Sequence, residues 1–143
     1  MRTTHPLEPI VGSPLGAKQF WQVSEATLDG ARIKAHLAGA GLDWMSVSSD
    51  GYWQPDVHAQ FLTDDAAVIL MHYTGLVQQT DRFAAAADAD QPTDWADQYM
   101  RLAVRFETGA QQYQYLWLNT NLFIAKGRLL GTGHIEYEVY RVL

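Results

Sequence analysis

Short apolar segments alternate along this chain with turn residues at a spacing of about eight to twelve residues, and this rhythm constrains the fold most strongly. Asp29 with Gly30, and again Asp50 with Gly51, are Asp-Gly pairs that favour tight hairpin turns. The segments between the turns are rich in aromatic and β-branched residues, which is typical of strands. The sequence therefore predicts an all-β fold, an antiparallel closed barrel of about eight to ten strands.

Two stretches depart from this rhythm. Residues 80–98 contain the alanine-rich segment TDRFAAAADAD, which predicts a short helical insertion that Pro92 ends, with Thr93 capping a further helical turn. Residues 1–17 contain three prolines, which disfavour a helix there. We expect an extended N-terminal arm over residues 1–17 and a single barrel domain over residues 18–143.

Charge and composition exclude several classes of function. The net charge of −6 argues against a protein that grips nucleic-acid phosphates. The absence of cysteine excludes disulfides, thiolate metal sites and cysteine nucleophiles. The longest apolar run, residues 66–71, is too short to cross a bilayer, and the N-terminal residues lack the apolar core of an export signal. We expect a cytoplasmic protein with no nucleic-acid and no membrane partner.

Two histidines are expected to lie side by side on neighbouring strands. A turn near Asp64 joins the segment with His58 to the segment with His72, and both lie at similar distances from it. They could form an acid–base pair, since histidine is the usual proton carrier at neutral pH, or two metal ligands, or they are ordinary surface histidines. No HxH or HExxH spacing supplies a third ligand, so we expect no metal.

Three charged side chains share one face of the strand predicted at residues 99–107, because side chains alternate along a strand. They are Arg101, Arg105 and Glu107. Together they could bind a substrate oxyanion, with Glu107 orienting an arginine, or they form a structural ion pair. The sequence leaves open which face of each strand points inward.

A strand is also predicted over residues 112–127, with Tyr115, Trp117 and Asn119 on one face. So many aromatic side chains on one face are seldom exposed to water, which favours a cavity wall with one hydrogen-bonding group.

Asp43 stands beside Trp44 in a glycine-rich segment. A carboxyl next to an indole and away from water has a raised pKa and can act as acid or base; alternatively, Asp43 caps a turn.

Four motifs in the same order give the chain a family resemblance. They are GAGLDWMSVSSDG at residues 39–51, VHAQFLTDDAAVI at residues 57–69, DQYMRLAVRFETGA at residues 97–110 and YLWLN at residues 115–119. Over residues 20–143 the sequence resembles the domain-of-unknown-function 3237 family. The resemblance implies a calycin-like or allene-oxide-cyclase-like β-barrel with a ligand cavity. The chain departs from the family pattern at Ala66, where glycine is expected, and at His58, where arginine is expected.

These observations predict a cofactor-independent enzyme that performs isomerase, cyclase or hydro-lyase chemistry by proton transfer. Its substrate would be an apolar molecule with a carbonyl or phenol, held inside the barrel. The expected catalytic residues are Asp43, His58, His72, Arg101 and Arg105. The expected substrate-binding residues are Trp44, Glu107, Tyr115, Trp117 and Asn119. No phosphate loop and no flavin or nicotinamide motif is readable, so no cofactor is expected.

Two other functions fit the same sequence. One is a non-catalytic, lipocalin-like binding protein for a hydrophobic metabolite, which needs the cavity and no proton carrier. The other is a scaffold whose outer aromatic side chains form an oligomer interface. Each interpretation is compatible with a homo-oligomer, and a dimer is favoured because the N-terminal arm could reach a neighbouring copy.

Overall fold

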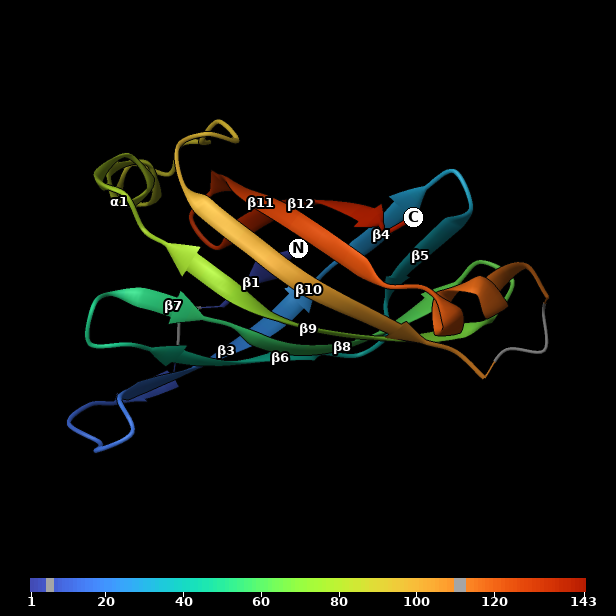
Figure 1. Cartoon of the computed structure of the whole chain (residues 1–143), viewed down its shortest axis with the longest axis horizontal. Coiled ribbons are helices and arrows are strands. Elements are labelled where there is room, and N and C mark those ends of the chain that lie inside the picture. Colours follow the sequence, from blue (N-terminus) through green and yellow to red (C-terminus); the bar gives the residue numbers. More distant parts are fainter. Residues whose placement is uncertain (5–6, 110–112) are drawn as a thin grey trace.

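The computed structural model describes residues 1–4, 7–109 and 113–143, and strands dominate it (Figure 1). The strands are β1 (Arg2–Thr3), β2 (Leu7–Ile10), β3 (Ala17–Glu25), β4 (Thr27–Gly30), β5 (Ile33–Leu37), β6 (Gly41–Val47), β7 (Tyr52–Gln54), β8 (Asp56–Thr63), β9 (Val68–Gln78), β10 (Tyr99–Glu107), β11 (Phe123–Gly131) and β12 (His134–Arg141). The helices are α1 (Asp81–Asp88) and the 3₁₀ helix η1 (Tyr113–Thr120). The predicted antiparallel β fold with a short helical insertion is confirmed.

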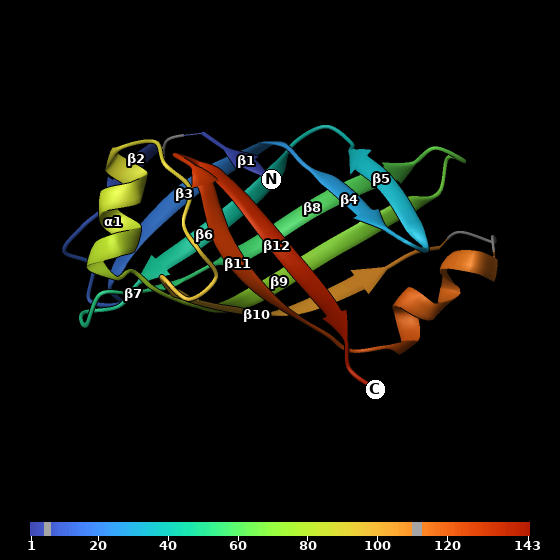
Figure 2. The ribbon, with the colours of Figure 1, turned by 90° about the horizontal axis from the view of Figure 1, so that it is seen from above.

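Antiparallel pairing joins eight strands into a ring, in the order β3, β6, β8, β9, β10, β11, β12, β1 and back to β3. The last step depends on β1 alone, because Arg2 lies opposite His134 of β12 on one side and Glu25 of β3 on the other. The four remaining strands, β2, β4, β5 and β7, widen the sheet outside this ring. Figure 2 shows β11 and β12 crossing in front of β8 and β9, which lie side by side, so the sheet curls back over its own face.

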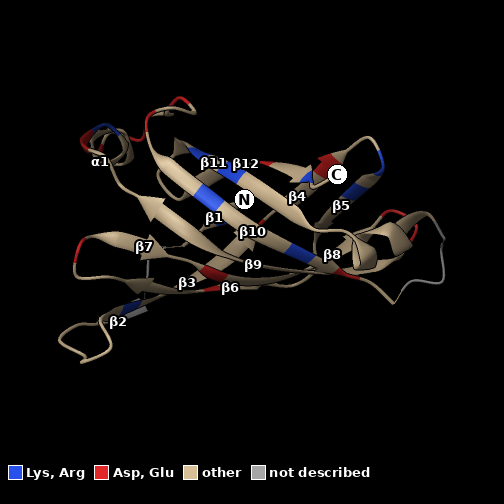
Figure 3. Ribbon diagram, in the orientation of Figure 1, with Lys and Arg blue, Asp and Glu red and all other residues tan. Residues whose placement is uncertain are grey.

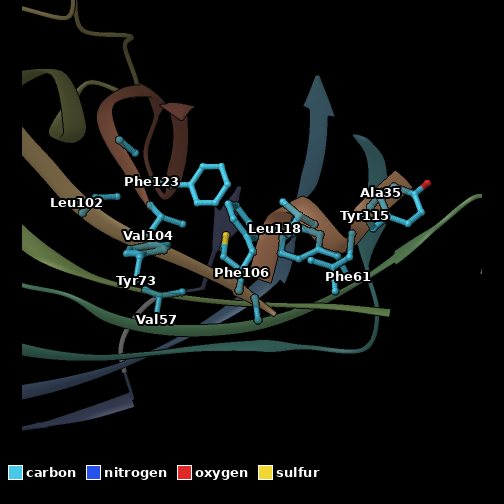
Figure 4. Packing of buried hydrophobic residues seen from close by; sticks show 14 of the residues in the cluster. Ala35, Val57, Phe61, Tyr73, Leu102, Val104, Phe106, Tyr115, Leu118 and Phe123 are labelled. Carbon is cyan, nitrogen blue, oxygen red and sulfur yellow. The ribbon is translucent and has the colours of Figure 1, made fainter. Parts of the chain in front are cut away.

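Alternating burial shows which face of each strand points into the ring. On β8, Val57, Ala59 and Phe61 are buried, whereas His58 and Gln60 are exposed. Strands β9, β10 and β11 alternate in the same way along most of their length. Most inward side chains form a main core, in which rings and aliphatic chains from opposite strands meet (Figure 4), and Val77, Met100 and Leu129 form a smaller cluster with Phe83. The polar residues that alternate with them therefore lie on the outside.

Helix α1 forms where alanines replace the strand pattern. Thr80 is its N-cap and accepts a hydrogen bond from the Phe83 N–H, and the buried Phe83 ring anchors the helix on the sheet. After Thr93, where a further helical turn is predicted, a single hydrogen-bonded turn forms from Asp94 to Asp97, and no helix forms over these described residues. The Thr93 hydroxyl instead accepts a hydrogen bond from the Leu129 N–H at 3.0 Å, which ties this segment to β11. Across the described part of the chain, no helix has the length and apolar character to cross a membrane.

The strand predicted over residues 112–127 is wrong in its first half. Residues 113–120 form η1, and the strand begins only at Phe123; Gln112 lies outside the described residues. The physical reason is that two asparagine side chains bond to backbone groups and compete with the strand ladder, one of them across eleven residues of the chain. Asn119 holds the backbone of Thr108 at both its N–H (2.8 Å) and its carbonyl (2.9 Å), and Asn121 donates to the Trp117 carbonyl. Leu118 of η1 thereby becomes part of the core.

Candidate functional site

A cavity of about 690 Å³, open to solvent on one side, extends from the β4–β5 hairpin to the inner face of the ring. Its walls are mainly apolar and include Phe61, Leu102, Val104, Phe106 and Phe123, several of which Figure 4 shows facing one another. Cavities of this size and lining are typical of sites for small organic molecules. The cavity predicted from the aromatic content of the sequence is therefore present, although different strands supply most of its wall.

Two tyrosines place hydroxyl groups in the cavity wall, in addition to the polar and charged residues Thr27, Asp29, Arg32, His134, Glu136 and Arg141. Tyr73 of β9 and Tyr137 of β12 both line the cavity, and their hydroxyl oxygens are 3.0 Å apart. Gly127 faces Tyr137 across the ladder, and a Cβ at this glycine would lie 2.8 Å from the tyrosine ring, so glycine makes room for the ring. One hydroxyl donates to the other, which leaves one O–H proton of the pair for a further acceptor. The Sδ atom of Met1, 3.7 Å from the Tyr73 oxygen, lies in position to accept it.

Asp43 points to the same interior from β6. Its side chain is buried, and it sits directly between Trp21 of β3 and Val57 of β8 in the ladder. The backbone N–H of Asp56 donates to Asp43 Oδ1 at 3.1 Å. Burial raises the pKa of Asp43 to about 6; the Asp56 N–H opposes this rise, and the nearby Asp56 carboxylate adds to it. Asp43 thus changes protonation state close to neutral pH.

Asp43 and the tyrosine pair influence one another electrostatically. Burial raises the pKa of Tyr73 well above its ordinary value, and contact with Tyr137 and the charge of Asp43 raise it further. Burial likewise raises the pKa of Tyr137, with a further rise from Asp43. Val57 separates Asp43 from Tyr73 in the ladder, so their backbones are about 10 Å apart. Among the described residues no direct hydrogen bond joins Asp43 to either phenol, and a proton passing between them needs a substrate atom or water in between.

Four of the five predicted catalytic residues lie outside the ring. His58 and His72 are directly opposite each other on β8 and β9, as expected of neighbours, but both point away from the cavity. Arg101 and Arg105 also point outward from β10, where Figure 3 shows basic positions along the strand. The prediction that a histidine or arginine works beside Asp43 is corrected. The reason is strand alternation, because the inward neighbours of these residues are Val57, Tyr73 and Leu102.

The predicted substrate-binding residues divide between the two faces. Trp44 is 47% exposed and packs edge-on against Phe20 outside the ring, so the indole in register with Asp43 is that of Trp21. Glu107 is also outside, where it pairs with Arg105 at 3.3 Å.

Helix η1 gives the other three predicted binding residues different surroundings. The hydroxyl of Tyr115 donates to Asp65 at 2.9 Å, and Asn119 is engaged with Thr108 as described above. Trp117 alone of the three lines the cavity, with the Arg32 guanidinium 4.3 Å from its ring. The wall function predicted for Trp117 is therefore compatible with its place in the structure.

Sequence reasoning missed Tyr73, Tyr137, Trp21 and the carboxylate of Asp56. The signal for Tyr73 was present, since it alternates with His72, but it could be used only once the inward face of the strand was known. The sequence places Tyr137 on the last strand, but no local pattern indicates that its hydroxyl contacts the hydroxyl of Tyr73, 64 positions earlier in the chain.

Comparisons with known proteins agree with this architecture. The model of a family described as "protein of unknown function (DUF3237)" matches residues 1–142. Among curated proteins no match is found.

Several solved structures are similar in fold. A conserved protein of unknown function from Rhodopseudomonas palustris has 22% identity and a TM-score of 0.81, over 99% of this chain and 93% of that one. A β-barrel-like protein from Acinetobacter baumannii has 21% identity and a TM-score of 0.75, over 99% and 96% of the two chains. A protein described as an enzyme from Penicillium herquei has 16% identity and a TM-score of 0.69, over 99% and 86%. At these identities the similarity shows the fold alone.

Proposed function

This chain belongs to the DUF3237 family of proteins of unknown function, and we propose from its interior geometry that it is a cofactor-independent small-molecule enzyme. The reaction would be of the isomerase, cyclase or hydro-lyase type and would proceed by proton transfer on an apolar substrate with a carbonyl or phenol. The observation behind this proposal is a hydrogen-bonded phenol pair in the wall of an apolar cavity, with the buried Asp43 carboxyl close enough to raise the pKa of both phenols.

The groups divide the chemistry between them. Asp43, with a pKa of about 6, is deprotonated in a large fraction of molecules at neutral pH and can accept a proton from a carbon next to a carbonyl. The electron pair of that C–H bond moves to the carbonyl oxygen, and the O–H of Tyr73 or Tyr137 donates a hydrogen bond to the resulting oxyanion. Both phenols remain protonated, because their pKa values are raised. Return of the proton to another carbon completes an isomerisation.

The cavity wall selects the class of substrate. Phenylalanine, leucine and valine side chains form much of the wall, which favours a molecule with a large apolar part, and charged residues including Arg32 and Glu136 also line the cavity. Trp117 keeps its predicted role as wall, while His58, His72, Arg101 and Arg105 are not part of this mechanism. The fold is compatible with catalysis, since the related protein from Penicillium herquei is described as an enzyme.

A turnover screen tests the proposal. The purified chain is incubated with enones, phenols, lactones and terpenoid epoxides, and the products are read by liquid chromatography and mass spectrometry. A product of unchanged mass indicates an isomerase or cyclase, and a gain or loss of water indicates a hydro-lyase. Asp43→Asn and the double variant Tyr73→Phe/Tyr137→Phe should lose at least about a hundredfold in rate, the usual size of an acid–base contribution. Arg101→Gln, on the outer face, is the matched control; equal activity of all four proteins would contradict the proposal.

A non-catalytic binding protein for a hydrophobic metabolite is the second candidate. The apolar cavity favours it, because the cavity alone suffices for binding. Ligands that are retained without conversion, by the natural chain and by Asp43→Asn alike, would decide for this function.

For either function we propose a cytoplasmic homo-oligomer, with a dimer favoured. A monomeric mass in light scattering would contradict that assembly.

A further inference from the structure

Three side chains with metal-ligand chemistry meet on the outer face of the sheet, away from the cavity. Asp56 and His58 lie two positions apart on β8 and therefore share a face, and His72 of β9 is the direct cross-strand neighbour of His58. The Nε2 atom of His72 is 2.8 Å from Asp56 Oδ1, and the Nε2 atom of His58 is 3.1 Å from the same oxygen. One ligand atom from each residue lies within 4.8 Å of the other two.

We propose that Asp56, His58 and His72 form a binding site for a divalent transition metal, with Zn²⁺ as its simplest occupant. Two imidazoles and one carboxylate are a common ligand set for such ions, and three protein ligands leave further coordination positions for water.

The donor atoms are slightly too close together for a tetrahedral ion, because each Nε2 now contacts Asp56 Oδ1 directly. Donor atoms 2.8 and 3.1 Å apart subtend angles of about 84° and 95° at a metal that is about 2.1 Å from each of them, the usual length of zinc bonds to nitrogen and oxygen. A tetrahedral angle of about 109° needs a separation of about 3.4 Å, so the carboxylate oxygen must move about 0.3 to 0.6 Å away from each nitrogen when Zn²⁺ binds. The backbone contributes rigidity, since two adjacent strands of the ring hold all three residues.

The imidazole rings must turn for both nitrogens to face one ion. At present they stack with centroids 4.2 Å apart and planes 16° from parallel. Their side chains are 61% and 43% exposed, which leaves room for a rotation about the Cβ–Cγ bond. A surface groove lined by Leu42, Leu70 and Glu107 runs past the histidines and leaves the open coordination positions accessible.

The nearest cation on the same face is Arg105, which lies opposite His72 in the ladder. Its charge is offset by Glu107 at 3.3 Å, so the face does not repel a divalent ion with an unbalanced positive charge. The sequence-based expectation of no metal considered only HxH and HExxH spacings. In the structure the third ligand is Asp56, two positions before His58 on β8, and His72 on β9 completes the set.

Titration of the tag-free, chelator-treated chain with Zn²⁺ in a calorimeter tests this site. We expect one Zn²⁺ per chain, with binding weakened at least tenfold in His58→Gln and in His72→Gln. His36→Gln is the matched control, because His36 is also an exposed histidine on a strand of this sheet. Binding that survives in the His58→Gln/His72→Gln double variant, or that is lost equally in His36→Gln, would overturn the proposal.

A second measurement uses the natural chain and does not depend on the variants folding. In long-range ¹H–¹⁵N spectra of the imidazoles, Zn²⁺ should shift the ring nitrogens of His58 and His72 and leave those of His36 in place. Unshifted His58 and His72 at saturating Zn²⁺ would equally overturn the site. The result is independent of the proposed enzyme function, since neither measurement involves the cavity.

Discussion

Asp43 differs from most aspartates, which are exposed and ionised at neutral pH. Its carboxyl is buried among apolar side chains and its pKa rises to about 6. The sequence indicated a raised pKa but assigned it to the neighbouring Trp44, which points outward. Adjacent residues of a strand cannot share a face, so the indole next to Asp43 comes from Trp21 on the partner strand. The sequence alone did not indicate that β3 pairs with β6.

The raised pKa of Asp43 predicts a pH-dependent effect on stability. The folded chain binds the Asp43 proton more tightly than the unfolded chain, so ionisation costs stability above about pH 6, and the cost disappears as the pH falls toward 4. An asparagine side chain in the variant Asp43→Asn would keep an acceptor for the Asp56 N–H without the charge. We expect this variant to unfold with about 3 kcal/mol more free energy than the natural chain at pH 8 and with nearly equal free energy at pH 4. Urea unfolding at both values checks this; an equal difference at the two pH values would refute it.

Ala66 departs from the family's glycine, and the backbone explains why glycine suits the position. Its φ is +66°, in the left-handed region that costs L-residues about 1 kcal/mol. Ala66→Gly should therefore raise the free energy of unfolding by up to about 1 kcal/mol. Ala31→Gly, at an exposed turn residue without positive φ, is the control and should lower it. Urea midpoints of the two variants decide, and a loss of stability in both would contradict the argument.

At the scale of elements, the strands were predictable and the exceptions were not. Alternation and Asp-Gly pairs locate most strands, although the first hairpin turns at residues 31–32, just after Asp29 and Gly30. Helix η1 was missed because YLWLN alternates well enough for a strand. What overrides the alternation is a contact between Asn119 and Thr108, and a one-dimensional pattern does not report such contacts.

Asn119 should therefore be a main determinant of η1. Asn119→Ala removes both hydrogen bonds to the Thr108 backbone, with an expected loss of about 1 to 3 kcal/mol in unfolding free energy. Asn119→Asp keeps the acceptor for the Thr108 N–H and should lose less. Hydrogen exchange locates the effect, with faster exchange expected in residues 114–120. Unchanged exchange there in Asn119→Ala would show that η1 forms for another reason.

At the scale of the whole molecule, the ring depends on its first residues. The Met1 carbonyl accepts from the Ile135 N–H at 2.8 Å, and the Thr3 N–H donates to the Gly133 carbonyl at 2.7 Å, so β1 fills the space between β3 and β12. The prolines nearby predicted an extended chain, which is compatible with these pairings. That two residues complete the ring was not predictable, since the strand is shorter than any periodic pattern can reveal.

Removal of residues 1–4 should open the ring along β12. The amide of Ile135 would lose its partner, and β12 would become an unprotected edge that favours self-association. We expect rapid hydrogen exchange at Ile135 and a larger mass in light scattering, with α1 still protected as an internal control. Slow exchange at Ile135 in the shortened chain would show that β12 is held in another way.

The inner face of the ring holds the proposed chemistry, and the outer face holds the proposed metal site. The sequence analysis identified Asp43 and the two histidines as functional candidates but assigned them to one site. The inward face of each strand becomes known only from the closed ring. The two proposals are tested by different experiments, although Asp56 connects the two faces: it is a proposed metal ligand, and its carboxylate raises the pKa of Asp43.

Exchange of substrate hydrogen with solvent deuterium tests the central claim most directly. The natural chain and Asp43→Asn are incubated in D₂O with the compounds of the turnover screen, and the label is located by mass spectrometry. Proton transfer by Asp43 should introduce deuterium next to the carbonyl or phenol carbon, at a rate at least about a hundredfold lower in Asp43→Asn. Undiminished exchange in Asp43→Asn, or compounds that bind in the cavity and are recovered without deuterium, would contradict it.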